Sequence, residues 1–87
     1  MLIDNRCVMY GKPHPEGYLA GASALGLETC DALVIEDAPA GVDAGKAAGM
    51  TVLAVATTHE LAELHEADDC VPTLKEAHAL IRAWLKR

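Results

Sequence analysis

The sequence predicts an α/β fold in which about three parallel strands alternate with about four helices. Two short runs of branched apolar residues, Ala32–Glu36 and Thr51–Thr57, have the pattern of strands that are covered on both faces. Segments with helical spacing of apolar residues precede, separate and follow these runs. Because strands that alternate with helices pair in parallel through right-handed crossovers, we expect residues 1–87 to form a single domain on one parallel sheet.

The N-terminal part is expected to contain one helix after an irregular segment. Residues 1–14 are predicted to be irregular, although "MLI" and "CVMY" are each long enough for a short strand. From Pro15 to Leu25 the apolar positions, including Tyr18 and Ala22, have helical spacing, and Pro15 suits a first helical turn. Gly26 is placed to end this helix in a left-handed conformation.

The rest of the chain alternates strands and helices. A second helix is predicted from Pro39 to Ala48, with Gly49 as its stop. Thr-x-x-Glu spacings that begin at Thr57 and Thr73 are typical of capping boxes and predict helices that run to about residue 67 and residue 86. Between these helices, "DDCVP" is long enough for a short third strand.

Composition excludes several classes of function. The chain has 13 acidic and 7 basic residues, a net charge of -6, and its Lys and Arg residues do not cluster except at the C-terminus, so no nucleic-acid partner is expected. Three widely spaced cysteines without a Cys-x-x-Cys pair predict reduced, half-buried thiols. No apolar run approaches the roughly 20 residues of a membrane span, so we expect a cytoplasmic protein.

Two acidic residues lie at the predicted carboxyl end of a parallel strand, where ligand-binding side chains are commonly found. Glu36 and Asp37 follow the run "ALVI", and side chains at the carboxyl ends of parallel strands commonly form the ligand site. Mg²⁺ binds through one or two carboxylates together with waters and substrate phosphate. The pair could equally be a helix-start acid that is stabilised by the helix dipole beside a solvated glutamate. Both interpretations stay open on this dipeptide alone.

The segment "GKPHPEGY" adds a restrained lysine. Pro13 forces Lys12 towards an extended conformation, and Pro15 begins the next helix. A lysine held in this way can act as a point charge on a phosphate, although a Lys-Pro pair by itself is usually an ordinary surface turn.

Together these segments resemble a known enzyme family. "GKPHPEGYLAGASALGL" followed by "ALVIEDAPAGVDAGKAAGMTVLAVATT" is similar to the third and fourth motifs of haloacid dehalogenase-like phosphatases, and most similar to the sugar-phosphate and glycerol-phosphate phosphatases and β-phosphoglucomutases. The resemblance runs from about Gly11 to the C-terminus. It implies a Rossmann-like three-layer sandwich that is truncated and has no cap domain.

The resemblance also implies roles for individual residues. Lys12 matches the lysine that neutralises the nucleophilic aspartate and the transferred phosphoryl group, and Asp37 matches the acid that coordinates Mg²⁺, with Glu36 as a direct or water-mediated ligand. His14 and Thr57 are expected near the phosphate. Gly41, Ala44, Ala48 and Gly49 are expected to pack the following helix closely on the sheet. His59, His65 and His78 are predicted to be surface groups.

One half of the family's site has no counterpart in this sequence. The first motif, Asp-x-Asp-Gly-Thr, supplies the nucleophile and the general acid, and the 87 residues contain no such segment. Phosphoryl transfer of this type needs a nucleophile as well as charge stabilisation, so we expect this chain to act on small phosphate monoesters only when completed, and to be inactive alone. Asp4 would substitute as nucleophile only if Met1–Ile3 paired beside Ala32–Glu36, and Arg6 stands where the second acid is needed.

The alternative function is a non-enzymatic interaction module or split-enzyme subunit. In the family, the strand with the first motif lies against the strand with the fourth, so its absence is expected to leave one apolar edge of Ala32–Glu36 unpaired. Exposed strand edges recruit other strands. We therefore expect a homodimer, or a partner chain that supplies the missing motifs across this edge.

Overall fold

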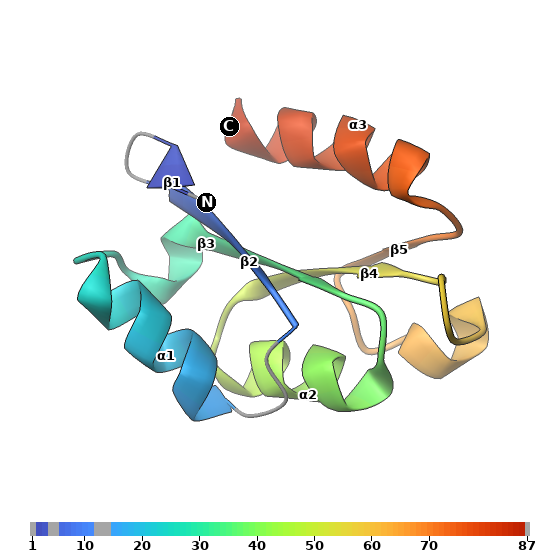
Figure 1. The fold of residues 1–87 in the computed structure, drawn as a ribbon, viewed down its shortest axis with the longest axis horizontal. Coiled ribbons are helices and arrows are strands. Elements are labelled where there is room, and N and C mark those ends of the chain that lie inside the picture. Colours follow the sequence, from blue (N-terminus) through green and yellow to red (C-terminus); the bar gives the residue numbers. More distant parts are fainter. Residues whose placement is uncertain (1, 4–5, 12–14, 87) are drawn as a thin grey trace.

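The computed structural model describes residues 2–3, 6–11 and 15–86. The elements, in chain order, are β1 (Leu2–Ile3), β2 (Arg6–Tyr10), α1 (Pro15–Ala24), η1 (Thr29–Asp31), β3 (Ala32–Glu36), α2 (Pro39–Ala47), β4 (Thr51–Val55), η2 (Leu61–Leu64), β5 (Asp69–Val71) and α3 (Leu74–Leu85). Figure 1 shows α1 and α2 on one face of the sheet and α3 on the other. The predicted three-layer α/β fold is therefore confirmed.

The strands lie in the sheet in the same order as in the sequence. Its strand order is β1-β2-β3-β4-β5, and the strands from β2 to β5 are parallel, whereas β1 pairs with β2 in the antiparallel direction. The described sheet thus has four parallel strands where the sequence predicted about three. Because the parallel strands point the same way, the ends of β2, β3 and β4 meet at one edge of the sheet, where Tyr10 pairs with Ile35 and Glu36 with Ala54.

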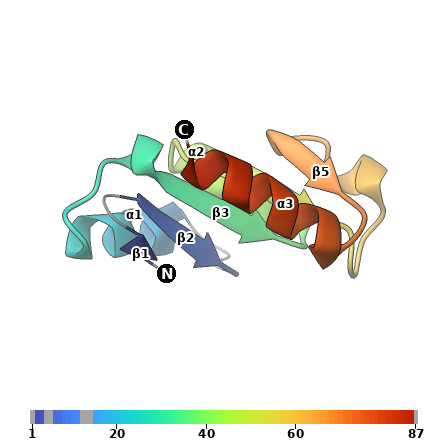
Figure 2. The ribbon, with the colours of Figure 1, turned by 90° about the horizontal axis from the view of Figure 1, so that it is seen from above.

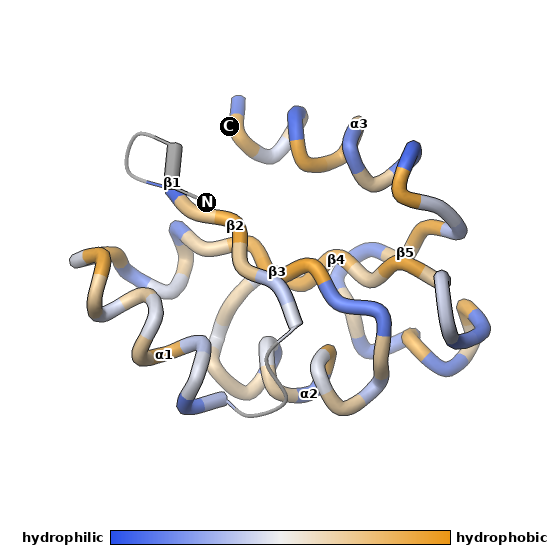
Figure 3. Tube along the Cα trace, in the orientation of Figure 1, coloured by the Kyte–Doolittle hydropathy of each residue, from blue (hydrophilic) through white to orange (hydrophobic). Residues whose placement is uncertain are grey.

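The core consists of two apolar layers, one on each face of the sheet. All five residues of β3 are buried, as expected for a strand that is covered on both sides. Tyr18 and Leu64 fill the layer beneath α1 and α2, and Trp84 and Ala77 fill the layer beneath α3. In Figure 3 the trace is orange along the strands and turns blue where β3 ends, which marks the start of the polar edge.

The prediction that residues 1–14 are irregular is wrong for residues 2–3 and 6–10. The segment "RCVMY" forms β2 because Cys7 and Val8 bury their side chains on opposite faces of the sheet. β2 pairs in parallel with β3 through the crossover α1, so the expected unpaired edge of Ala32–Glu36 does not exist. Leu2 and Ile3 pair with Cys7 and Arg6 instead of β3, which removes the basis for Asp4 as a nucleophile.

The helix predicted from Thr57 to about residue 67 is also not formed. The chain makes a loop and then the short 3₁₀ helix η2, in which Leu64 is buried and Leu61 is exposed. One buried anchor does not provide the apolar stripe that stabilises a helix of several turns. The described chain consequently has three α-helices, and the capping box of this segment joins Glu60 to Glu63 rather than Thr57 to Glu60.

Glycines act as expected at two helix ends, and a different glycine packs α2 on the sheet. Gly26 and Gly49 have φ angles of 70° and 79°, the left-handed conformation that ends a helix. Gly49 is exposed and does not join the packing face of α2. Gly45 takes this place, because a Cβ there would lie 2.7 Å from Val52 Cγ2.

The cysteines are free thiols with different exposure. Cys7 is buried and Cys70 is half-buried, but Cys30 is exposed, contrary to expectation. Burial raises the pKa of the Cys7 and Cys70 thiols, so both stay protonated near neutral pH. Among residues 2–3, 6–11 and 15–86, no helix is long and apolar enough to cross a membrane.

Candidate functional site

The carboxyl ends of β2, β3 and β4 surround a cavity of about 260 Å³. Figure 2 shows the parallel course of β2 and β3 towards this edge. The start of α3 contributes Leu74, which is 53% exposed, opposite Tyr10, which is 57% exposed. The lining residues are Tyr10, Gly11, Ile35, Glu36, Asp37, Val55, Thr57 and Leu74. The lining is therefore mainly apolar, and Glu36, Asp37 and Thr57 are its polar members.

Asp37 is the half-buried acid at the centre of the site. It follows β3 directly, and its Oδ2 accepts hydrogen bonds from the hydroxyls of Thr57 at 3.4 Å and Thr58 at 3.3 Å. These distances exceed the usual 2.5–3.0 Å of O–H···O hydrogen bonds, so both contacts are weak. Since an ionised carboxylate has about four acceptor positions, the Asp37 carboxylate keeps capacity for another partner.

The loop after β4 is fastened to the backbone of Asp37. The Asp37 carbonyl accepts a hydrogen bond from Thr58 Oγ1 at 3.2 Å and lies 3.0 Å from His59 Nδ1. His59 Nδ1 also lies 2.9 Å from Thr58 Oγ1. His59 is half-buried rather than a surface group, so its prediction is wrong, whereas His65 and His78 are exposed as predicted. The position of His59, two residues after the predicted site residue Thr57, was the sequence feature that could have indicated its place beside Asp37.

Glu36 points into a different environment from Asp37. Its side chain is buried, with 7% exposed, and its Oε2 accepts a hydrogen bond from the Tyr18 hydroxyl at 3.0 Å. Its Oε1 accepts one from the backbone N–H of Asp37 at 3.2 Å. Sequence reasoning placed Tyr18 on the apolar face of α1 and did not identify this hydroxyl as part of the site, because helical spacing reports burial but not the polar partner of a buried tyrosine.

The oxygen donors at this edge fit a hard cation. Mg²⁺ commonly takes one or two carboxylates and completes its shell with waters and phosphate oxygens. Asp37 offers a carboxylate beside two hydroxyls, whereas the buried Glu36 carboxylate one residue earlier is directed to Tyr18 and to the Asp37 N–H. Within the described part of the chain, no group of three or more His, Cys, Asp and Glu side chains could hold a metal ion. Among the described residues, Asp37 is the acid whose carboxylate could take part in coordinating such a cation.

The structure brings together three of the six predicted site residues. Glu36, Asp37 and Thr57 meet at the ends of β3 and β4. Thr57 does so as a partner of Asp37 and not as the start of a helix. Lys12 and His14 lie outside the described residues, and so does Asp4.

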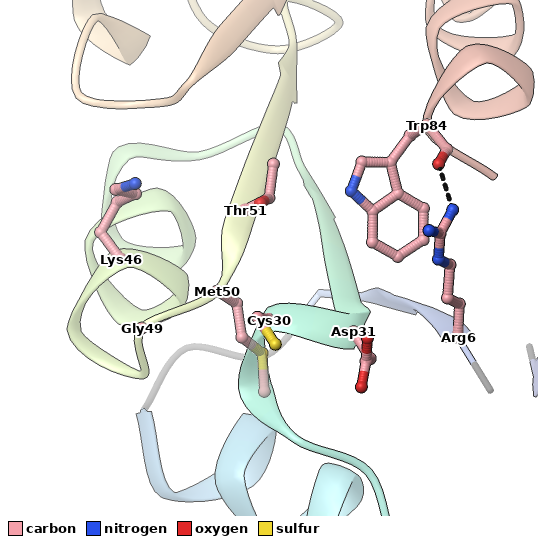
Figure 4. A pocket seen from close by; sticks show the side chains of 8 residues that line it. All are labelled: Arg6, Cys30, Asp31, Lys46, Gly49, Met50, Thr51 and Trp84. Atoms are coloured by element: carbon pink, nitrogen blue, oxygen red, sulfur yellow. Dashed lines mark hydrogen bonds between the residues drawn. The ribbon is translucent and has the colours of Figure 1, made fainter. Parts of the chain in front are cut away.

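A larger cavity of about 460 Å³ lies at the opposite end of the sheet. It is formed by residues before or at the start of β2, β3 and β4 together with Lys46 of α2 and Trp84 of α3, and Figure 4 shows the side chains around it. Its cations already have partners: Arg6 Nη1 donates to the Trp84 carbonyl at 2.7 Å, and Lys46 Nζ lies 2.9 Å from Asp68 Oδ1. The Asp37 carboxylate, which keeps capacity for another partner, is therefore the better candidate for a group that binds a cation.

Comparison with known proteins finds several related phosphatases. The chain is 46% identical over 76 residues to validoxylamine A 7'-phosphate phosphatase of Streptomyces hygroscopicus subsp. limoneus, covering 87% of this chain and 36% of that protein. It is 45% identical over 69 residues to hexitol phosphatase A of Escherichia coli (strain K12), covering 79% of this chain and 32% of that protein. The chain thus spans about a third of the length of these relatives.

A solved structure has the same arrangement of elements. The β-phosphoglucomutase of Clostridium difficile superposes with a TM-score of 0.70 at 28% sequence identity, covering 87% of this chain and 34% of that one. The family model of haloacid dehalogenase-like hydrolases matches residues 2–49, which is more than half of the sequence. The alternation of strands and helices, the acidic pair at the end of β3 and these matches lead to one conclusion: the chain belongs to the haloacid dehalogenase-like hydrolase family.

Proposed function

We propose that this chain forms the metal-binding and phosphate-binding half of a Mg²⁺-dependent phosphatase that acts on small phosphate monoesters such as sugar or glycerol phosphates. The observation that carries the proposal is the position of Asp37. Its carboxylate lies at the end of β3, beside a cavity and two hydroxyls, in a chain that is 46% and 45% identical to two phosphatases.

Each residue of the proposed site has a distinct task. Asp37 holds Mg²⁺, Glu36 supports it, and Thr57 and Thr58 keep the Asp37 carboxylate in place. Lys12 neutralises the phosphoryl group as a point charge, with His14 nearby. Bound Mg²⁺ would supply electrostatic stabilisation of the negative charge on the phosphoryl oxygens. The chain acts in the cytoplasm, where small phosphorylated metabolites are found.

The nucleophile in this proposal comes from sequence other than these 87 residues, either on the same polypeptide or on a partner chain. The carboxyl end of β2, next to β3, presents Tyr10 and Gly11, and neither can form an acyl phosphate. The alternative of an interaction module that pairs through the edge of β3 loses its premise, because β2 occupies this edge.

The first test is turnover by the 87-residue chain alone. We expect no release of phosphate from p-nitrophenyl phosphate, sugar phosphates or glycerol phosphates, with or without Mg²⁺. Mg²⁺-dependent turnover that is abolished by both Asp4→Asn and Asp37→Asn would instead place the nucleophile within this chain.

The second test completes the site in a chimera. The segment of Escherichia coli hexitol phosphatase A that aligns with this chain is replaced by the corresponding residues of this chain, including Lys12. We expect Mg²⁺-dependent hydrolysis of hexitol phosphates, and a loss of at least about 100-fold in kcat on Asp37→Asn, since charge stabilisation of the transition state is removed. Asp43→Asn, which changes an exposed acid on α2, is the matched control. Equal activity of both variants would refute the assignment of Asp37.

A further inference from the structure

The hydroxyl of Tyr18 is buried next to the Glu36 carboxylate. Tyr18 lies on α1 and is 0% exposed, and its hydroxyl donates to Glu36 Oε2 at 3.0 Å. A phenylalanine would fill most of the same space without bringing a polar group into the core. Because burying a hydroxyl is unfavourable unless it is hydrogen-bonded, its position depends on a partner such as Glu36.

Glu36 transmits this contact to the backbone of Asp37. One carboxylate oxygen accepts from Tyr18, and the other accepts from the N–H of Asp37 at 3.2 Å. The buried carboxylate therefore joins α1 to the first residue after β3. If the Glu36 carboxylate shifted, the backbone N–H of Asp37 would lose its acceptor or move with it. The loop that begins at Asp37 and directs this side chain to the cavity would then also shift.

The first turn of α2 is shaped to hold the Glu36 carboxylate. A Cβ at Gly41 would lie 1.9 Å from Glu36 Cδ and 2.1 Å from Oε2, so the carboxylate occupies the space that a side chain would take. Helix N-termini favour negative charge, and Gly41 is the third residue of α2. The carboxylate is thus held by a hydroxyl from α1, a backbone N–H after β3 and an opening on α2.

We propose that Tyr18 is a positioning residue, which fixes the Glu36 carboxylate and thereby sets the direction of Asp37 towards a bound divalent cation. This inference rests on the proposed function, because it takes Asp37 as the metal-binding acid. Hydrogen-bond partners of metal ligands orient the ligand before the ion arrives, so their removal weakens binding without removing a ligand.

The test is Mn²⁺ binding to the 87-residue chain, measured by electron paramagnetic resonance of free Mn²⁺. We expect Tyr18→Phe to raise the Kd by about 5-fold, less than the roughly 10-fold effect of losing a direct partner of a metal ligand, because Tyr18 acts through Glu36. Ala22→Gly is the control, since it weakens the same helix next to the same core but removes no hydrogen-bond donor. Its Kd should stay within about twofold of the wild-type value.

A second variant tests the same contact from another helix. Gly41→Ala leaves Tyr18 in place but displaces the Glu36 carboxylate, and alanine favours the helical conformation. We expect a loss of Mn²⁺ affinity similar to that of Tyr18→Phe. Circular dichroism of each variant shows that the fold is kept.

A double-substitution cycle separates positioning from general weakening. If the hydroxyl acts through Glu36, Tyr18→Phe has little further effect on the Kd in a Glu36→Met background, which removes both carboxylate oxygens from a side chain of similar length. Additive effects of Tyr18→Phe and Glu36→Met would overturn the proposal.

Asp37→Asn distinguishes failure of this inference from failure of the proposed function. If Asp37→Asn abolishes Mn²⁺ binding while Tyr18→Phe leaves the Kd within twofold, the positioning role is refuted and the metal site stands. If Asp37→Asn leaves Mn²⁺ binding unchanged, both the metal site and the role of Tyr18 are refuted.

Discussion

The two ends of the parallel sheet use their polar groups in opposite ways. At the amino end, Arg6 donates to the Trp84 carbonyl at 2.7 Å and Asp68 accepts from the Val52 N–H at 2.7 Å. At the carboxyl end, the contacts of the Asp37 carboxylate with described side chains are hydroxyl contacts of 3.3 and 3.4 Å. Short contacts to charged groups hold elements together, whereas a weakly bonded carboxylate can take up a cation. The charged groups at the amino end therefore stabilise the fold, and the carboxyl end is the proposed ligand site.

Cavity size alone would favour the amino end of the sheet over the proposed site. The cavity at the amino end measures about 460 Å³ and the one beside Asp37 about 260 Å³. The difference lies in whether charged groups are already paired. Substitutions at the amino end should thus lower stability and spare cation binding, and those at the carboxyl end should do the reverse.

The largest loss of stability is expected from Trp84→Ala. Trp84 is 8% exposed in the core beneath α3, and its ring lies 5.5 Å from the Arg6 guanidinium. Removing a buried aromatic side chain costs about 3–5 kcal/mol of the free energy of unfolding, measured by urea denaturation. Leu74→Ala, at the exposed carboxyl end of the same layer, should cost less than about 1 kcal/mol. Equal losses would contradict the contrast between the two ends.

Gly45→Ala should lower the free energy of unfolding by about 1–3 kcal/mol, because overpacking a close contact strains the core. The new Cβ would lie 2.7 Å from Val52 Cγ2 and 3.2 Å from Val34 Cγ1, both on rigid branched side chains. Gly21→Ala is the matched control, since its Cβ would meet only the flexible end of Met9 at 3.1 Å. Thermal unfolding should show a lower Tm for Gly45→Ala and an equal or higher Tm for Gly21→Ala.

Asp68→Asn should have a smaller, pH-dependent effect. Burial raises the pKa of Asp68, but hydrogen bonds from the Val52 N–H and Lys46 outweigh this and lower it. A lowered pKa gives stability that is present above the unfolded pKa of about 3.9 and is lost as the pH falls through the folded value. At pH 7 the substitution should cost about 0.5–1 kcal/mol, given the partial exposure of the pair.

The difference between wild type and Asp68→Asn should begin to shrink as the pH falls below about 4, where Asp68 of the unfolded chain is protonated, and should be smallest below the lowered pKa of folded Asp68. Urea denaturation at several pH values measures this difference in the free energy of unfolding. A difference that stays constant down to strong acid would show that the charge of Asp68 contributes no stability.

Thr58→Val is expected to change stability least. Its hydroxyl is exposed and its contacts to Asp37 are 3.2 and 3.3 Å, so the free energy of unfolding should change by less than about 0.5 kcal/mol. Mn²⁺ affinity should nevertheless fall, because the Asp37 carboxylate loses a contact that holds it beside the cavity. A large loss of stability with unchanged affinity would assign Thr58 to the fold rather than to the site.

Local patterns were sufficient to predict much of the fold. The buried runs that became β3 and β4, the helices that end before Gly26 and Gly49, and the acidic pair at the end of β3 could all be read from apolar spacing and glycine placement. These features depend on neighbours within a few residues. Cytoplasmic location and partner chains stay predictions.

The rest depended on contacts between residues far apart in the sequence. The segment "RCVMY" became a strand because β3 offered it an edge, and the segment after Thr57 stayed a loop because Asp37 and Leu64 hold it at two points. Such pairings are set by packing of the whole sheet and leave no periodic signal in a short segment.

The sequence by itself determined that Glu36 and Asp37 stand together at the end of a buried strand. Only the tertiary structure decided that their carboxylates diverge, with Glu36 directed to Tyr18 and Gly41 and Asp37 directed to the hydroxyls after β4. The physical reason is that adjacent residues of an extended chain face opposite sides, and what each side offers depends on which helix or loop the fold packs there.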